Sequence, residues 1–289
     1  MHRLRRDVLF ARRGRAAIYN DDHPDDAVAN HLKFLLVLDG EPIGTARLDL
    51  MQGVAKLRLV VIAEERQRQG HGAVRLIARR ENACLLEDAG SRTLEDFRQR
   101  HGEVAAITIF ARLLGSLQAP SPAPPPGALT PLARHFRGLT ERISPAHPDH
   151  AEDLAWAAAL AHELLASQVG IMPLHGDLHH ENILTADGTV WRAIDPHGLI
   201  GDPAYDSANF FGNPLGRPDI TCDPGRIRRI AQLTAPVIGC DEGKILRYAA
   251  AHAALSACWS IDDPMSEEDL SDAFDRLAFL RTVRRMLDV

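Results

Sequence analysis

Residues Pro173–Asp195 read PLHGDLHHENILTADGTVWRAID and crowd acids, amides and histidines between apolar runs. Within them, His175 and Asp177 form a His-x-Asp pair, and Asn182 follows five residues after the aspartate. The Asp-Gly dipeptide that comes next is typical of a tight turn. The run Val190–Ile194 then predicts a short strand that ends at Asp195. We expect this loop and hairpin to bring three oxygen-bearing side chains to one cleft.

This arrangement can supply what phosphoryl transfer from ATP requires. Asp177 is the candidate catalytic base, because a carboxylate can orient an attacking hydroxyl and accept its proton. Asn182 and Asp195 are candidate Mg²⁺ ligands, since this hard cation prefers carboxylate and amide oxygens. His175 is expected to brace the loop through hydrogen bonds. The residues therefore favour a kinase-like active site that uses ATP and Mg²⁺.

Two other interpretations of the same loop remain open. His175 and His179 lie four residues apart, which is a spacing seen in zinc-binding helices. Pro173 and Gly176 disfavour a helix there, however, and no third zinc ligand is evident in the sequence. The other interpretation is a polar loop that carries no chemistry at all.

The composition is that of an ordinary globular protein, with 289 residues, 45% hydrophobic and 25% charged. A net charge of −6 does not favour nucleic acid or an acidic membrane surface as a partner. No apolar run approaches the roughly 18 residues that a transmembrane helix needs. The four cysteines show no metal-ligand spacing and are read as reduced thiols, so we expect a cytoplasmic protein.

The hydrophobic patterning changes along the chain, from apolar and β-branched runs near the N-terminus to a helical period after Thr93. A stretch with six prolines, residues 119–131, predicts a stiff linker or loop. A few strands followed by many helices predict an α+β architecture with two lobes. We expect strands at 33–38, 42–50, 54–63, 73–78 and 83–86, and helices at about 93–118, 131–141, 149–169, 223–238, 242–260 and 266–288. The last helix has a candidate capping box that begins at Ser266.

Two quoted segments carry a family resemblance. HGDLHHENIL (175–184) and AIDPHGLIGDPAYDSANFFGNP (193–214) resemble the aminoglycoside phosphotransferase superfamily, most closely its streptomycin 6-phosphotransferase and hydroxyurea-resistance kinase branch. GAVRLIARRENACLLEDA (72–89) and ALTPLARHFRGL (128–139) are similar to the same branch. The resemblance covers about 72–289.

This resemblance implies a protein-kinase-like fold of class α+β, with a small, atypical N-terminal β lobe and a large, mainly helical C-terminal lobe. The phosphotransferase domain would span 73–289, with a hinge at about 86–90 and the helical lobe at 91–289. The backbone near Leu86, Glu87 and Ala89 would contact the adenine of ATP. The resemblance implies the same roles as those given above, with Asp177 as the base and Asn182 and Asp195 as metal ligands. Asp206 would brace the catalytic loop, although an N-terminal cap for a helix at 207–213 is an equal alternative.

Such kinases also need a glycine-rich turn and a strand lysine over the phosphates. Only Lys33, Lys56 and Lys244 are lysines, and no glycine-rich turn is evident before residue 72. Lys56 is the candidate phosphate ligand, the alternative being an exposed strand residue.

Residues 34–72 instead resemble the front half of a GCN5-related acetyltransferase. FLLVLDGEPIGTARLDL (34–50) and VAKLRLVVIAEERQRQGHG (54–72) match its strands and its loop for the acetyl-CoA pyrophosphate. The rest of that fold is absent from the sequence. We therefore expect residues 1–72 to form an acetyltransferase-like fragment that serves as, or replaces part of, the N-terminal lobe.

The leading hypothesis is an ATP-dependent phosphotransferase acting on an alcohol group of a small molecule, most simply a streptomycin-type aminoglycoside in antibiotic resistance. An acidic stretch, 262–275, is either a rim that attracts this polycation or a solvated helix face. The alternative functions are a catalytically impaired hybrid or kinase remnant, and an acetyl-CoA-binding protein.

Overall fold

The computed structural model describes residues 31–38, 41–51, 54–62, 72–80, 83–119, 129–141, 150–262 and 267–288. The chain divides into two compact units, Met1–Gly90 and Ser91–Val289, and each is described by itself. Several sequence expectations lie outside the described residues. These are the loop for the acetyl-CoA pyrophosphate up to residue 71, most of the proline-rich stretch and the candidate cap at Ser266.

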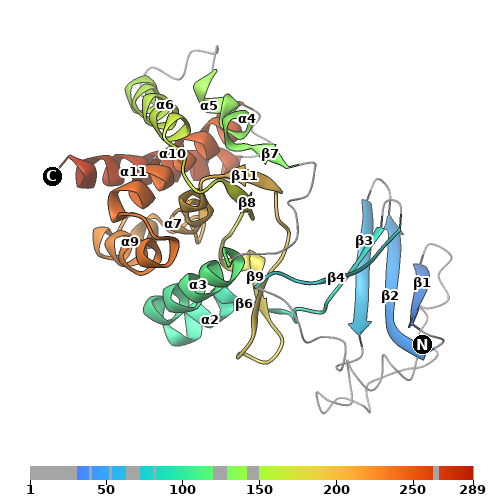
Figure 1. Ribbon diagram of the computed structural model, residues 1–289. Helices are drawn as coiled ribbons and strands as arrows, with labels where there is room; N and C mark the ends of the chain where they lie inside the picture. The colour runs from blue at the N-terminus through green and yellow to red at the C-terminus, as the bar shows by residue number, and fades with distance from the viewer. Residues whose placement is uncertain are drawn as a thin grey trace. The chain divides into compact units, whose positions relative to one another are not determined.

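The first unit is built from antiparallel strands. β1 (His31–Leu38), β2 (Glu41–Met51) and β3 (Val54–Ile62) form a sheet of order β1-β2-β3 (Figure 1). A separate ribbon pairs β4 (Leu76–Arg80) with β5 (Ala83–Leu86). All five predicted strands are confirmed, although β4 begins later than expected.

The second unit is mainly helical. The expected helices are confirmed, but the first one divides at Gly102, whose φ of +86° favours a residue without a Cβ. The region 131–141 likewise forms two short helices rather than one. The helices are α2 (Leu94–His101), α3 (Glu103–Leu117), α4 (Leu132–His135), α5 (Arg137–Thr140), α6 (Ala151–Ala166), α7 (Ala208–Phe211), α8 (Pro218–Thr221), α9 (Pro224–Ile238), α10 (Glu242–Asp262) and α11 (Glu267–Leu287).

Helix α10 forms the centre of the second unit. Its middle is rich in alanine and fully buried, so neighbouring helices can approach its backbone closely. It packs against α6, α7, α9 and α11, as Figure 1 shows. Because it is surrounded by other elements, it is apolar on nearly every side, unlike a surface helix. The rest of the core is arranged around this helix.

Short strands connect the helical core to the polar loops. β6 (Arg92–Thr93), β9 (Ile183–Thr185) and β10 (Trp191–Ala193) form one sheet of order β10-β9-β6. A second sheet has the order β7-β11-β8 and consists of β7 (Thr130–Pro131), β8 (Met172–Leu174) and β11 (Leu199–Gly201). The expected hairpin is thus confirmed as β9 and β10.

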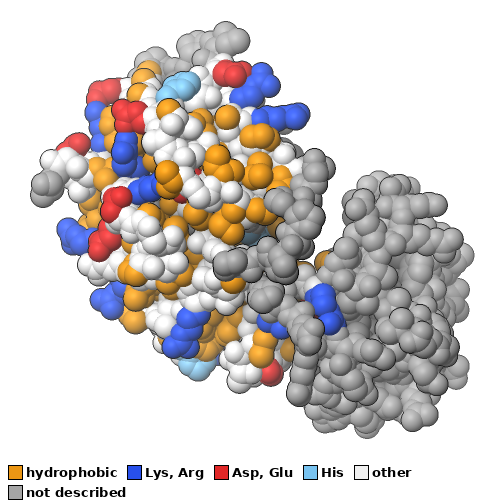
Figure 2. All heavy atoms as spheres, in the orientation of Figure 1, with side chains coloured by type: hydrophobic (Ala, Val, Ile, Leu, Met, Phe, Trp, Pro, Cys, Tyr) orange, Lys and Arg blue, Asp and Glu red, His pale blue; other side chains and the backbone are white. Residues whose placement is uncertain are grey.

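The surface of the second unit mixes charges of both signs. Figure 2 shows acidic and basic side chains interspersed around the described part of the face it draws, with apolar side chains between them. Exposed ion pairs such as Arg137 with Glu141 belong to this pattern. Within the described residues, no helix has the length and apolar character needed to cross a membrane. The thiol of Cys258 is buried, and those of Cys222 and Cys240 are half-buried.

We predict that Phe110→Ala lowers the free energy of unfolding by about 3–5 kcal/mol, the usual cost of emptying an aromatic site in a core. The Phe110 ring on α3 is fully buried and stacks on Phe210, with centroids 3.8 Å apart and planes 12° apart. Val104 lies on the same helix and is 51% exposed, so Val104→Ala should change stability by no more than about 0.5 kcal/mol. Urea unfolding measures both, and equal losses would contradict this packing.

Candidate active site

The polar segment 173–195 forms a loop and a hairpin between two of the short strands. β8 leads into residues 175–179, and a short 3₁₀ helix (His180–Asn182) then leads into β9. After the hairpin, residues 194–198 return the chain to β11, which pairs antiparallel with β8. The two ends of the segment therefore lie side by side.

A buried carboxylate holds the start of this loop. Asp206 accepts hydrogen bonds from the backbone N–H of His175 (3.0 Å) and of Gly176 (2.7 Å). Burial raises the pKa of Asp206 to about 6, although these two amides oppose that shift. Gly176 has a φ of +81°, and a Cβ there would lie 2.7 Å from Leu199, so the close approach requires glycine. Ser207, rather than Asp206, is the N-cap residue of α7.

His175 ties the loop to the strand that follows it. Its Nε2 lies 2.9 Å from the carbonyl of Ile194, and its Nδ1 accepts the backbone N–H of Asp177 at 3.3 Å. Only the neutral tautomer with its proton on Nε2 satisfies both contacts. Burial lowers the pKa of His175 to about 4, which favours this neutral form.

Two side-chain amides hold the carboxylate of Asp177. Asn209 donates to Oδ1 at 2.6 Å, and Asn182 donates to Oδ2 at 3.0 Å. Burial disfavours the charge, but the imidazoles of His179 and His197, 3.7 and 3.6 Å from Oδ2, help to lower the pKa to about 2. Asp177 is therefore ionised at neutral pH. Its side chain is 22% exposed and remains open to a ligand.

The geometry leaves oxygen atoms of two other residues free. The Nδ2 of Asn182 donates to both the carbonyl and the carboxylate of Asp177, so its Oδ1 must point elsewhere. Asp195 is exposed and has a φ of +60°, the only positive value among the described non-glycine residues. Among the described residues, its carboxylate makes no hydrogen bond or ion pair. The backbone N–H of Ile194, just before it, donates to the carbonyl of Asn182 at 2.9 Å.

Those two oxygens suit a hard divalent cation. One is an amide oxygen and the other is a carboxylate, which are donors that Mg²⁺ prefers. The donor chemistry of Asn182 and Asp195 therefore fits this ion. The zinc alternative finds no such fit, since the described residues contain no group of three or more His, Cys, Asp or Glu side chains that could hold a metal.

The residues predicted to meet the nucleotide belong to the first unit. Glu87 is buried and exchanges backbone and side-chain hydrogen bonds with Arg75, while Ala89 is buried and Leu86 is 37% exposed. Lys56 lies on β3 opposite Asp49 of β2. Its side chain lies outside the described residues.

The chain matches a known protein family over most of its length. The family described as aminoglycoside/hydroxyurea antibiotic resistance kinase matches residues 53–264. The chain belongs to this family. The match begins earlier than residue 72, where the sequence prediction placed its start, and so includes β3 and Lys56.

Two streptomycin kinases are similar to the chain. It is 36% identical over 224 residues to a streptomycin 3''-kinase of Klebsiella pneumoniae, covering 76% of this chain and 81% of that protein. It is 33% identical over 207 residues to a streptomycin 6-kinase of Streptomyces griseus, covering 68% and 65%.

Solved structures show the same fold. An apo structure of a thermostable mutant of aminoglycoside phosphotransferase APH(4)-Ia has a TM-score of 0.55 and 14% identity, covering 92% of this chain and 98% of that one. At this identity the likeness shows the fold alone. This chain thus has the expected protein-kinase-like α+β fold, with a mainly helical C-terminal part.

The contact between Asn209 and Asp177 was not predicted from the sequence. The signal was present but weak, because Asn209 is a polar residue within the apolar run that follows Asp206. A polar residue there could as easily have faced solvent. Its partner is 32 positions away, so only the tertiary structure pairs the two.

The acidic C-terminal stretch is only partly described. Side chains 262–269 lie outside the described residues. Asp272 and Asp275 line a small cavity together with Arg217 and Arg276. Two of the stretch's acids therefore lie beside basic side chains, and the choice between a substrate rim and a solvated face stays a prediction.

We predict that His135→Gln makes stability less sensitive to acid. Burial is the main cause that lowers the pKa of His135 to about 4, and the nearby His197 lowers it further. In the unfolded chain the same histidine has its ordinary pKa of about 6.5. Between these values the unfolded chain binds more protons, so this contribution to stability is lost as the pH falls. The glutamine side chain would keep a polar group near the Tyr205 hydroxyl, 2.7 Å from the wild-type ring, without titrating.

Urea unfolding at pH 7, 6, 5 and 4 tests this prediction. Asp206 acts in the opposite direction, because its raised pKa favours the folded state as the pH falls from about 6. The informative quantity is therefore the difference in the free energy of unfolding between the variant and the wild type. This difference should become smaller or change sign as the pH falls. A difference in the free energy of unfolding that stays constant with pH would show that the pKa of His135 is not lowered by folding.

Proposed function

We propose that this protein transfers the γ-phosphate of ATP to a hydroxyl of a streptomycin-type aminoglycoside. The observation that carries the proposal is the ionised carboxylate of Asp177, held by the amides of Asn182 and Asn209 yet partly open to solvent. A carboxylate fixed in this way can orient a hydroxyl and take its proton as the new oxygen–phosphorus bond forms. The similarity to two streptomycin kinases supports this acceptor.

Asn182 and Asp195 would hold a Mg²⁺ ion in this site. A bound Mg²⁺ would neutralise phosphate charge during the transfer. The hydrogen bonds within the loop leave the oxygen of Asn182 available to a metal, because its N–H groups donate to Asp177. Asp195 adopts a left-handed backbone conformation, of a kind that is concentrated at functional sites because the surrounding structure must enforce it.

The loop geometry supports structural roles for two other predicted residues. His175 would act as a brace, since it bonds to both Asp177 and the carbonyl before Asp195. Asp206 would fix the loop by accepting its amides. Neither side chain needs to touch the substrate for these roles.

The first unit would contribute to nucleotide binding. Lys244, in the second unit, forms an ion pair with the buried Asp202 at 2.5 Å, which leaves Lys33 and Lys56 as the other lysines. Because the family match includes β3, we propose Lys56 as the phosphate ligand and the backbone at Leu86, Glu87 and Ala89 as the adenine contact. In this proposal, residues 1–72 serve as part of the N-terminal lobe and 73–289 form the phosphotransferase domain.

We predict that Asp177→Asn lowers the rate of streptomycin phosphorylation by about 10²–10⁴-fold, the usual contribution of a general base. An ATP-consumption assay with streptomycin measures the rate, and thermal unfolding checks the fold. Asp219→Asn is the matched control, because this aspartate is 62% exposed and pairs only with Arg217 in the described residues. Undiminished turnover in Asp177→Asn would exclude Asp177 as the base.

We also predict that Asp195→Ala and Asp195→Gly weaken Mg·ATP binding by at least about tenfold, or about 1.4 kcal/mol. Both variants remove the carboxylate, but only glycine adopts the positive φ without cost, so a loss common to both reports on the ligand. Calorimetry measures the binding. Retained Mg·ATP affinity in Asp195→Gly would contradict the metal role.

The same calorimetry separates the alternative functions. Acetyl-CoA binding by the wild type, without Mg·ATP binding, would favour the acetyltransferase-like interpretation of residues 34–72. Binding of neither ligand would favour a kinase remnant. Mg·ATP binding with phosphate transfer to streptomycin is the result expected from the proposed reaction.

A further inference from the structure

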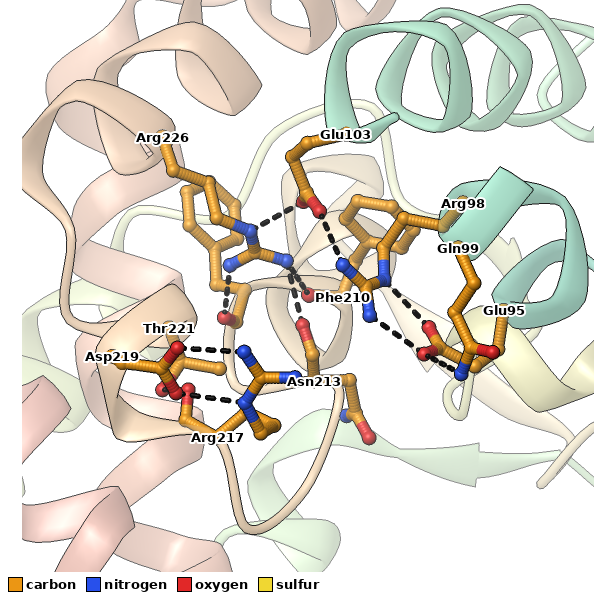
Figure 3. Close-up of polar contacts among 11 residues, drawn as sticks. Glu95, Arg98, Gln99, Glu103, Phe210, Asn213, Arg217, Asp219, Thr221 and Arg226 are labelled. Atoms are coloured by element: carbon orange, nitrogen blue, oxygen red, sulfur yellow. Dashed lines mark hydrogen bonds and ion pairs between the residues drawn. The ribbon is translucent and has the colours of Figure 1, made fainter. Parts of the chain in front are cut away.

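Arg226 of α9 is buried, yet its guanidinium faces backbone carbonyls rather than solvent. It donates to the carbonyl oxygens of Phe211 (2.7 Å) and Asn213 (2.6 Å), and more weakly to that of Phe210 (3.4 Å). These carbonyls belong to the end of α7 and the residues just after it. Figure 3 shows the guanidinium directed at this turn. Arg226 therefore fixes the path of the chain from 210 to 213.

A carboxylate on another helix holds the opposite side of the guanidinium. Glu103, at the start of α3, accepts from Nε of Arg226 at 2.5 Å. The other oxygen of Glu103 accepts from Arg98 at 3.4 Å, and Arg98 makes two 2.7 Å bonds to Glu95 on α2 (Figure 3). The long helices α3 and α9 thus hold the short helix α7 through a single buried side chain.

The same turn reaches the catalytic carboxylate through two asparagines. Asn213 donates through Nδ2 to the backbone carbonyl (2.8 Å) and to Oδ1 (3.1 Å) of Asn209. Since Oδ1 of Asn209 accepts from Asn213, its Nδ2 is the end that faces Asp177, to which it donates at 2.6 Å. Both asparagines are buried. The hydrogen bond from Asn213 therefore sets the orientation of the Asn209 amide.

We propose that Arg226 and Asn213 are positioning residues for phosphoryl transfer, acting through Asn209 to hold the Asp177 carboxylate. This inference rests on the proposed function for its catalytic meaning. The contact chain runs from Glu103 through Arg226, Asn213 and Asn209 to Asp177. It adds to the catalytic loop a support that comes from α9 and α3.

A purely structural role explains Arg226 less well. Burial lowers the pKa of its guanidinium, so the charged form is disfavoured by desolvation and supported mainly by Glu103. Such pairs often give no more stability than well-packed apolar residues of similar volume. What an arginine provides and an apolar residue cannot is a rigid fork of donors that fixes several carbonyls at once. Fixed geometry is what a carboxylate that must orient a hydroxyl requires.

The test compares Arg226→Lys with the matched control Arg217→Lys. Lysine keeps the charge beside Glu103 but loses the fork that spans the carbonyls. Arg217 lies close by in sequence, but it is 51% exposed and turns to Asp219, as Figure 3 shows. The first readout is the side-chain amide signal of Asn209 in ¹⁵N-labelled protein, assigned by its loss in Asn209→Leu. The second is the separate effect on kcat and KM for streptomycin and ATP.

We expect the Asn209 amide signal to shift in Arg226→Lys and in Asp177→Asn, but not in Arg217→Lys. We expect kcat to fall about 10- to 100-fold in Arg226→Lys, as for a misplaced reacting group, with each KM within about twofold of wild type. A merely structural role would lower the unfolding temperature without moving the amide signal. An unmoved signal in folded Arg226→Lys, or an equal loss of kcat in Arg217→Lys, would overturn the proposal.

Two further results keep this test decisive. If Arg226→Lys does not fold, Asn213→Ala removes the donor to Asn209 and must shift the same signal, or the proposal fails. If the wild type does not phosphorylate streptomycin, the proposed function fails at that point. The amide signal then still decides whether Arg226 and Asn213 hold Asn209 on Asp177, because it needs no turnover.

Discussion

The site depends on one buried interaction, the acceptance of two loop amides by the carboxylate of Asp206. The amides of His175 and Gly176 point inward at the start of the loop that carries Asp177, and without an acceptor each would be a buried donor left unpaired. A side chain 30 positions further along the chain supplies both acceptor oxygens. Gly176 completes the fit because no Cβ could pass Leu199. Where Asp206 lies therefore decides where Asp177 lies.

From that anchor, the polar groups of the site divide their hydrogen bonds in a definite way. His175 uses both ring nitrogens on the backbone, so it orients the loop and offers no free nitrogen. Asn182 uses its N–H groups on Asp177 and keeps an oxygen, while Asn209 uses its oxygen on Asn213 and directs its N–H group to Asp177. The result is one oriented carboxylate on Asp177 and an available oxygen on Asn182, which are groups that suit a nucleophile and a hard cation.

The helical core gives this polar region its rigidity. α10 is lined with alanines that let α7, α9 and α11 pack close to its backbone. α7 is only four residues long and could not hold its own shape as an isolated helix. It is fixed instead by α10 on one side and by Arg226 at its carboxyl end. A weak local element thus carries Asn209 because stronger elements surround it.

The amino-acid pattern was enough to predict the types of the long elements and the residues of the polar loop that carries Asp177. Apolar and β-branched runs predict the strands of the first unit, helical periodicity predicts the long helices, and the pattern His175-x-Asp177 with Asn182 marks the loop. Helix α8 was not predicted, and α7 was expected only as the alternative of a capped helix at 207–213, because four residues are too few to show a period. The contacts that link Arg226, Asn213 and Asn209 to Asp177 form only in the folded chain. Their contacts join residues far apart in the chain, and spacing along a sequence carries no information about which distant polar groups will satisfy one another once they are buried.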